Sequence, residues 1–155
     1  MADQITVDQR GVLTRCPSCG STNRLPYAAL ARRVRCGKCQ TTLDAPSSPI
    51  EVSGAFFDAM ISTSSVPVVV DFWAPWCGPC RVVSPILADM ADEHDRVKFV
   101  KLNVDENPET QARYNVLSIP TVILFEAGEA RETVIGARSR SHYEGAWERW
   151  LSPAA

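Results

Sequence analysis

The stretch "PVVVDFWAPWCGPC" at residues 67–80 constrains the fold of this 155-residue chain more than any other. Its first seven residues form an apolar, β-branched run of strand length that is interrupted only by Asp71. An apolar run without alternation predicts a strand that is buried on both faces, as in the sheets of α/β proteins. The sequence from Cys77 onward has helical periodicity, so this stretch predicts a buried strand that leads directly into a helix.

The remaining pattern extends this strand–helix order along the chain. Ser53 is a plausible N-cap for a helix, and Pro85 lies inside the helix that follows Cys77. We predict an α/β fold, with a central mixed sheet and helices on both faces. The expected helices are 53–61, 77–94, 107–115 and 139–151, and the expected strands are 67–73, 97–105 and a hairpin over 121–136. The second helix should bury one face: Val82, Val83, Ile86, Leu87 and Met90.

The charge distribution divides the chain into two parts. Residues 1–43 carry a formal charge of +5, and the rest of the chain carries −7. The segment "DAPSSP" after the basic part is rich in Pro and Ser and disfavours regular structure. We therefore predict a small four-cysteine domain at 1–43, a linker at 44–50 and the α/β domain at 51–155.

The bulk composition excludes several classes of protein. No apolar run approaches the roughly 18–20 residues that span a bilayer, and the first residues lack a secretory signal pattern. We expect a cytoplasmic location, where thiols stay reduced. The six cysteines are therefore expected to be metal ligands or redox catalysts rather than a structural disulfide framework.

Cys77 and Cys80 have the spacing and position of a redox pair. Thiol–disulfide exchange needs one thiolate that attacks a disulfide and a second thiol that resolves the mixed disulfide. The N-terminus of a helix stabilises a thiolate through its free N–H groups and partial positive charge. We predict that Cys77 is the nucleophile and that Cys80, about one turn inside the helix, is the resolving thiol.

Asp71 lies in the middle of the predicted buried strand. A buried carboxylate without a partner is costly, and desolvation raises its pKa towards neutrality. A carboxyl group in that range can serve as general base for the buried thiol. The alternative is an ionised Asp71 held in a salt bridge at a strand end.

The other four cysteines form two Cys-x-x-Cys pairs, Cys16/Cys19 and Cys36/Cys39, with sixteen residues between them. This spacing is typical of a closed four-thiolate zinc site, and Gly20 and Gly37 suit the tight turns of such a site. About forty residues cannot fold alone on apolar burial, so one structural or regulatory Zn²⁺ is expected. The alternative is that these pairs are further redox dithiols or disulfides.

The basic N-terminal part also raises the possibility of nucleic-acid binding. Four thiolates and one Zn²⁺ contribute −2, which lowers the charge of this part to about +3. Tyr27 is its only aromatic residue, so no stacking platform is present. We expect no nucleic-acid binding here.

Four segments, "VDFWAPWCGPCR", "KLNVDENP", "SIPTVILF" and "VIGA", resemble the thioredoxin family in their order and spacing. The resemblance covers residues 50–151. It implies a thioredoxin fold and a protein dithiol–disulfide reductase with a redox-active Cys77–Cys80 disulfide and no organic cofactor. It also implies that the Ile119–Pro120 peptide is cis and faces Cys77, although an ordinary trans proline is the alternative.

The resemblance assigns further site residues. Trp76, the Ile119 backbone and Gly136 would form the groove for a substrate strand, next to Gly78 and Pro79 of the "WCGPC" motif. Lys101 would lie near Asp71 and help to set its titration. Trp73 would pack beside the site, as a core aromatic or with a catalytic role. Pro75 departs from the family pattern, which often has an acidic residue there.

The N-terminal segment resembles the zinc-finger extension of bacterial thioredoxin-2 type proteins. This resemblance implies disulfide-containing protein substrates and an NADPH-dependent thioredoxin reductase as electron donor, often under oxidative stress. We expect a monomer that does not associate with membranes. Two alternatives remain: an oxidant or isomerase with the same fold, and a zinc-dependent adaptor or nucleic-acid-docking protein that uses the fold as a binding surface.

Overall fold

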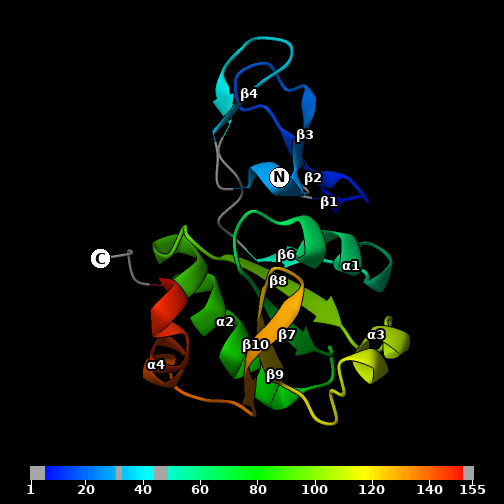
Figure 1. The fold of residues 1–155 in the computed structure, drawn as a ribbon, viewed down its shortest axis with the longest axis vertical. Coiled ribbons are helices and arrows are strands. Elements are labelled where there is room, and N and C mark those ends of the chain that lie inside the picture. The colour runs from blue at the N-terminus through cyan, green and yellow to red at the C-terminus, as the bar shows by residue number, and fades with distance from the viewer. Residues whose placement is uncertain (1–5, 31–32, 44–48, 152–155) are drawn as a thin grey trace.

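The structure is a computed structural model, and it describes residues 6–30, 33–43 and 49–151. A five-stranded mixed sheet forms the centre of the larger part, in the order β10-β9-β7-β8-β6 (Figure 1). β6, β7 and β8 are parallel, whereas β9 is antiparallel to both β7 and β10. The strands are β6 (Ile50–Glu51), β7 (Val68–Trp73), β8 (Lys98–Asn103), β9 (Thr121–Glu126) and β10 (Glu129–Ile135). The predicted mixed sheet is confirmed.

Helices cover both faces of this sheet, as predicted. Val68, Val70 and Phe72 of β7 join the core on the side of α1, and Val69 joins the core on the side of α2 and α4. This alternation follows from the period of two in a strand. The helices are α1 (Gly54–Thr63), α2 (Gly78–Glu93), α3 (Pro108–Arg113) and α4 (Arg140–Leu151).

One local expectation is confirmed and another needs correction. Ser53 is the N-cap of α1, but its side chain makes no capping hydrogen bond. The Asn107 side chain accepts a hydrogen bond from the Gly54 N–H at 2.7 Å instead. Val82 is 61% exposed, because α2 buries a narrower stripe of Cys80, Val83, Leu87, Met90 and Ala91. Adjacent residues such as Val82 and Val83 are about 100° apart on a helix, so the core accommodates only one of them.

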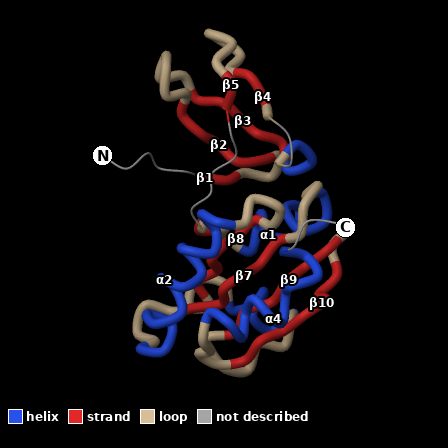
Figure 2. Tube along the Cα trace, turned by 90° about the vertical axis from the view of Figure 1, so that its left-hand side faces the viewer, coloured by secondary structure: helices blue, strands red, loops and turns tan. Residues whose placement is uncertain are grey.

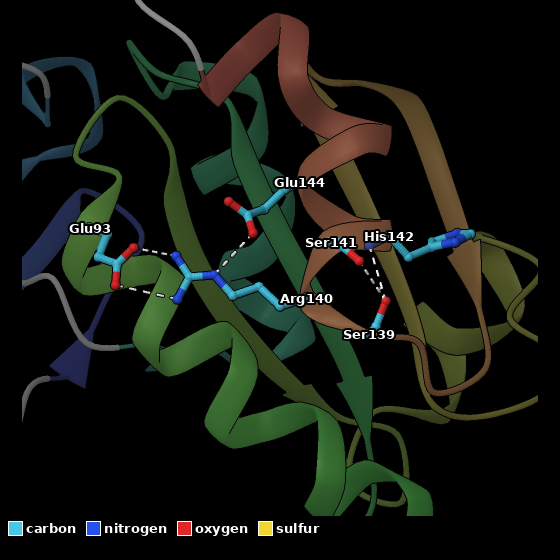
Figure 3. A network of polar contacts seen from close by, with 6 residues as sticks. All are labelled: Glu93, Ser139, Arg140, Ser141, His142 and Glu144. Carbon is cyan, nitrogen blue, oxygen red and sulfur yellow. Dashed lines mark hydrogen bonds and ion pairs between the residues drawn. The ribbon is translucent and has the colours of Figure 1, made fainter.

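Helix α4 is held against the end of α2 by polar contacts (Figure 3). The Arg140 guanidinium contacts Glu93 of α2 and donates to Glu144 of its own helix, the latter at 3.1 Å. The Ser139 hydroxyl accepts a hydrogen bond from the His142 N–H at 3.3 Å, which satisfies one free donor of the first turn. These contacts lie on the surface, above the fully buried aromatic residues of α4, Tyr143 and Trp147.

The N-terminal part contains two small antiparallel sheets, β1-β2-β3 and β4-β5. It lies next to α1, and its residues belong to the same apolar cluster as the α1 side of the large sheet (Figures 1 and 2). Tyr27 is at the centre of this contact: it is 1% exposed, and its carbonyl accepts from the Ser65 N–H at 3.1 Å. The elements are β1 (Thr6–Val7), β2 (Gly11–Arg15), β3 (Thr22–Pro26), the short 3-10 helix η1 (Tyr27–Ala29), β4 (Val34–Arg35) and β5 (Thr42–Leu43).

Most of the predicted linker, residues 44–48, lies outside the described residues. Ile50, which was expected in the linker, already belongs to β6 and pairs with Val100 of β8. Among the described helices, none is both long and apolar enough to cross a bilayer.

Candidate redox site and cysteine cluster

Cys77 and Cys80 form a disulfide at the N-terminus of α2, with their Cα atoms 5.3 Å apart. Cys77 is the N-cap residue, and its Sγ accepts a hydrogen bond from the Cys80 N–H at 3.2 Å. Pro79 occupies the first turn, where the missing N–H costs nothing. The Cys77 sulfur therefore lies at the positive end of a 16-residue helix, where a thiolate is stabilised.

Asp71 lies in β7 beneath this helix and is 2% exposed. Within the described part of the chain, neither of its carboxylate oxygens has a hydrogen-bond partner. Burial raises the pKa of Asp71 to about 7, and the charge of Glu51 adds to that increase, while the charge of Lys101 and the nearby Ser84 hydroxyl oppose it. The alternative of an ion-paired Asp71 at a strand end does not fit this position, because Asp71 pairs in mid-strand with both Lys101 and Val122.

The Ile119–Pro120 peptide is cis. Ile119 packs against the apolar cluster that contains Cys77 and Cys80. The Gly136 N–H donates to the Pro120 carbonyl at 2.8 Å, and Gly136 has φ +84, a conformation that favours glycine. The structure thus brings Pro120 and Gly136 together.

Trp76 is 68% exposed, and its indole N–H donates to the Asp105 carboxylate at 3.0 Å. Leu117 and Ile135 are also exposed, at 86% and 58%, and both flank the Pro120–Gly136 contact in the sequence. The sequence pattern did not indicate Asp105, Leu117 and Ile135 as residues near the site. Exposed apolar residues and long-range polar partners have no periodic signal that could have indicated them.

Lys101 and Trp73 lie together beside Asp71. The Lys101 ammonium is 4.2 Å from the centre of the Trp73 ring, and the Trp73 indole N–H donates to Glu51 at 3.1 Å. A cavity of about 490 Å³ opens here, and its lining includes Cys80 together with Trp73 and Lys101. No pattern in the sequence indicated that Glu51 lies at this site.

The four remaining cysteines form one cluster, in which all Sγ atoms lie within 4.8 Å of one another. The Sγ atoms of Cys16 and Cys39 are 3.6 Å apart, as are those of Cys19 and Cys36. Four sulfurs at about 2.3 Å from a tetrahedral Zn²⁺ are separated by about 3.8 Å, so these residues fit that ion. None of the four is in a disulfide.

Two similar turns build this cluster. In the first, the Gly20 N–H donates to the Cys16 carbonyl at 2.9 Å, and in the second the Gln40 N–H donates to the Cys36 carbonyl at 3.0 Å. Both Gly20 and Gln40 have positive φ, +77 and +66, so Gln40 rather than the expected Gly37 corresponds to Gly20.

Hydrogen bonds to the Cys36 sulfur favour its thiolate form. The Ser21 hydroxyl, with further donors from the Cys39 and Lys38 N–H groups, lowers the pKa of the Cys36 thiol to about 5. A thiolate is the form that binds a metal ion. The four residues could therefore hold one Zn²⁺, which would cross-link β2, β4 and the turns that follow them.

A sequence profile of the thioredoxin family matches residues 48–146. The chain belongs to the thioredoxin family. It is 41% identical over 143 residues to thioredoxin M4, chloroplastic, of Arabidopsis thaliana, which covers 92% of this chain and 73% of that protein. It is also 42% identical over 106 residues to thioredoxin of Synechocystis, which covers 68% of this chain and 99% of that protein.

A solved structure, that of a mutant thioredoxin from Halobacterium salinarum, is similar to 73% of this chain and 99% of its own, with a TM-score of 0.66 and 31% identity. These relatives and the Cys77–Cys80 disulfide show a thiol–disulfide oxidoreductase with the thioredoxin fold. The family profile begins at residue 48, so the four-cysteine cluster lies outside the matched residues.

Proposed function

We propose that this chain is a zinc-containing thioredoxin of the thioredoxin-2 type, which reduces disulfides in cytoplasmic protein substrates. The observation that carries the proposal is the reactive disulfide at the start of α2, above a buried carboxyl group without a hydrogen-bond partner in the described structure. The four-cysteine cluster, which fits one Zn²⁺, supports the thioredoxin-2 assignment. We also propose a division into a four-cysteine domain at 1–43 and a thioredoxin domain that begins with β6 at Ile50, joined by a short linker.

In the proposed reaction the reduced protein acts through two displacements. The Cys77 thiolate attacks one sulfur of the substrate disulfide, and the other substrate sulfur leaves as a thiolate. Asp71 accepts the proton of Cys80, and the Cys80 thiolate then attacks the Cys77 sulfur of the mixed disulfide. The substrate leaves as a dithiol and the Cys77–Cys80 disulfide forms, so two electrons pass from the protein to the substrate.

The surface around the disulfide supports a protein substrate. Trp76, Gly78, the Ile119 backbone and Gly136 would contact an extended segment of the substrate, and Pro120 would position it over Cys77. A thioredoxin reductase that uses NADPH would restore the dithiol. Lys101 would influence the protonation of Asp71 through its charge.

Insulin reduction with NADPH and a thioredoxin reductase tests this function. We expect turnover by the wild type and none by Cys77→Ser. The variant Cys80→Ser should accumulate mixed disulfides with substrates that a small dithiol releases. If Cys77→Ser turned over fully, or if partners bound Cys80→Ser without any disulfide, the reductase proposal would fail in favour of an adaptor.

The redox potential separates the reductase from an oxidant or isomerase with the same fold. Thioredoxin has a potential of about −270 mV and protein disulfide isomerase about −180 mV. We expect a value near the former for the Cys77–Cys80 pair. A measured potential at or above the latter would favour an isomerase.

A further inference from the structure

A row of three charged residues crosses the sheet beside the redox site. Asp71 of β7 pairs with Lys101 of β8, and Lys101 pairs with Glu51 of β6. Paired residues on neighbouring strands point to the same side of a sheet. The row on this side therefore consists of the Asp71 carboxyl group, the Lys101 ammonium in the middle and the Glu51 carboxylate. Trp73 lies two residues beyond Asp71 and therefore points to the same side.

Trp73 connects the outer carboxylate to the central cation. Its indole N–H donates to Glu51 at 3.1 Å, and its ring lies 4.2 Å from the Lys101 ammonium. Among the described residues, Lys101 makes no ion pair with either Asp71 or Glu51. The ammonium therefore lies over an aromatic ring whose indole N–H is hydrogen-bonded to Glu51.

We propose that Glu51 is a positioning residue that controls when Asp71 gives up its proton. Glu51 orients Trp73, attracts the Lys101 ammonium away from Asp71, and adds a second negative charge to the row. This rests on the proposed role of Asp71 as general base. Glu51 itself touches neither cysteine in the structure, so it acts only through Trp73, Lys101 and its own charge.

Few other groups near Asp71 could shift its pKa. Helix α2 presents the Cys77–Cys80 disulfide and the Ser84 hydroxyl, and the disulfide does not titrate. Helix α4 contributes Tyr143, whose pKa is raised mainly by its burial. On β9 the paired residue is the apolar Val122. Lys101 and Glu51 are the charged residues that influence Asp71, with opposite signs.

The cavity beside the redox site borders the middle of the row, where Lys101 lines it. Its lining includes Trp73, Lys101, Cys80 and Ser84, together with Pro49 immediately before β6. Glu51 lies exposed at the edge of the row. Burial of its carboxyl group raises its pKa, whereas the hydrogen bond from Trp73 and the charge of Lys101 lower it and favour the carboxylate. A charged carboxylate at the edge of the row attracts the Lys101 ammonium away from Asp71, whereas a neutral residue at this position would not.

The test is the titration of Asp71 in the oxidised full-length protein, followed by the ¹³C signal of its carboxyl carbon. The disulfide removes both cysteines from the titration. In Glu51→Gln, which keeps an acceptor for Trp73, we expect the Asp71 midpoint to fall by about half a pH unit or more. Glu109→Gln, which removes one exposed carboxylate from α3, should leave the midpoint unchanged.

The same pair of titrations in a Lys101→Met background tests the role of Lys101. In this background, Glu51→Gln should shift the Asp71 midpoint by less than half as much, because there is no Lys101 ammonium that could move towards Asp71. An equal shift of the Asp71 midpoint with and without Lys101 would show that Glu51 and Asp71 do not compete for its ammonium group. No difference between Glu51→Gln and Glu109→Gln would overturn the proposal altogether, and thermal unfolding of each variant excludes a folding defect as the cause.

Insulin-reduction pH profiles of the same variants separate this inference from the proposed function. If Glu51→Gln lowers both the Asp71 midpoint and the pH at which activity rises, both stand. If the midpoint moves and the activity profile does not, Glu51 still controls Asp71, and the role of Asp71 as general base is wrong.

Discussion

Cys77 and Cys80 lie on one turn of a helix, whereas Cys16, Cys19, Cys36 and Cys39 lie on two turns that face each other. All three pairs have the same Cys-x-x-Cys spacing. Cys77 and Cys80 bond to each other in a disulfide. In the cluster, each cysteine of one turn instead contacts a cysteine of the opposite turn, Cys16 with Cys39 and Cys19 with Cys36. The comparison shows that backbone geometry, rather than spacing, separates a redox pair from half of a four-cysteine cluster.

The largest expected effect tests whether the two centres are separate. Cys36→Ser removes one ligand, so Zn²⁺ bound per chain should fall from one to near zero in native mass spectrometry, since a closed structural zinc site needs all four ligands. Insulin turnover at Cys77 should persist within about threefold. A loss as complete as that of Cys77→Ser would show that the two centres depend on each other.

Asp71, next to the Cys77–Cys80 pair, should make the unfolding free energy depend on pH. Its pKa is raised from 3.8 to about 7, so the unfolded chain ionises first and folding becomes less favourable as the pH rises between these values. The wild type should therefore lose up to about 4 kcal/mol of unfolding free energy between pH 4 and 8 relative to Asp71→Asn. Urea unfolding at several pH values measures this, and parallel curves for the two proteins would contradict it.

Tyr27 tests whether the two parts fold as one unit. It is buried in the cluster that also contains Phe57 and Met60 of α1. Tyr27→Ala should lower the unfolding free energy by about 3 kcal/mol, because it leaves a cavity between the two parts. The large domain should lose stability together with the cysteine cluster in hydrogen exchange. Tyr27→Phe, which loses only the hydrogen bond to the Asp8 carbonyl, should cost about 1 kcal/mol.

The smallest effect compares the two cysteine turns with each other. Gly20 and Gln40 both have positive φ, which costs a residue with a side chain about 1 kcal/mol. Gly20→Ala should therefore destabilise the chain by about 1 kcal/mol, and Gln40→Gly should stabilise it by a similar amount. Thermal unfolding of both variants measures this, and shifts of the same sign would contradict it.

Much of the fold and site could be predicted from local patterns. The run around Asp71 indicated a buried strand, and the cysteine spacing indicated a shared cluster, because both signals lie within short windows of sequence. Val82 was placed on the wrong face, since the width of the stripe that α2 buries depends on the elements packed against it and not on the periodicity of the helix. The Asn107 contact at the start of α1 was missed because its two partners lie 53 residues apart.

The sequence by itself determined which residues carry the chemistry: two cysteines that begin a helix, an aspartate in an apolar strand, and four cysteines at the spacing of a metal site. Only the tertiary structure decided how these groups are surrounded. Register across β6, β7 and β8 placed Glu51 and Lys101 in one row with Asp71. Packing of Tyr27 against α1 joined the two parts in one core. Strand pairing and packing depend on residues far apart in the chain, and no local pattern specifies them.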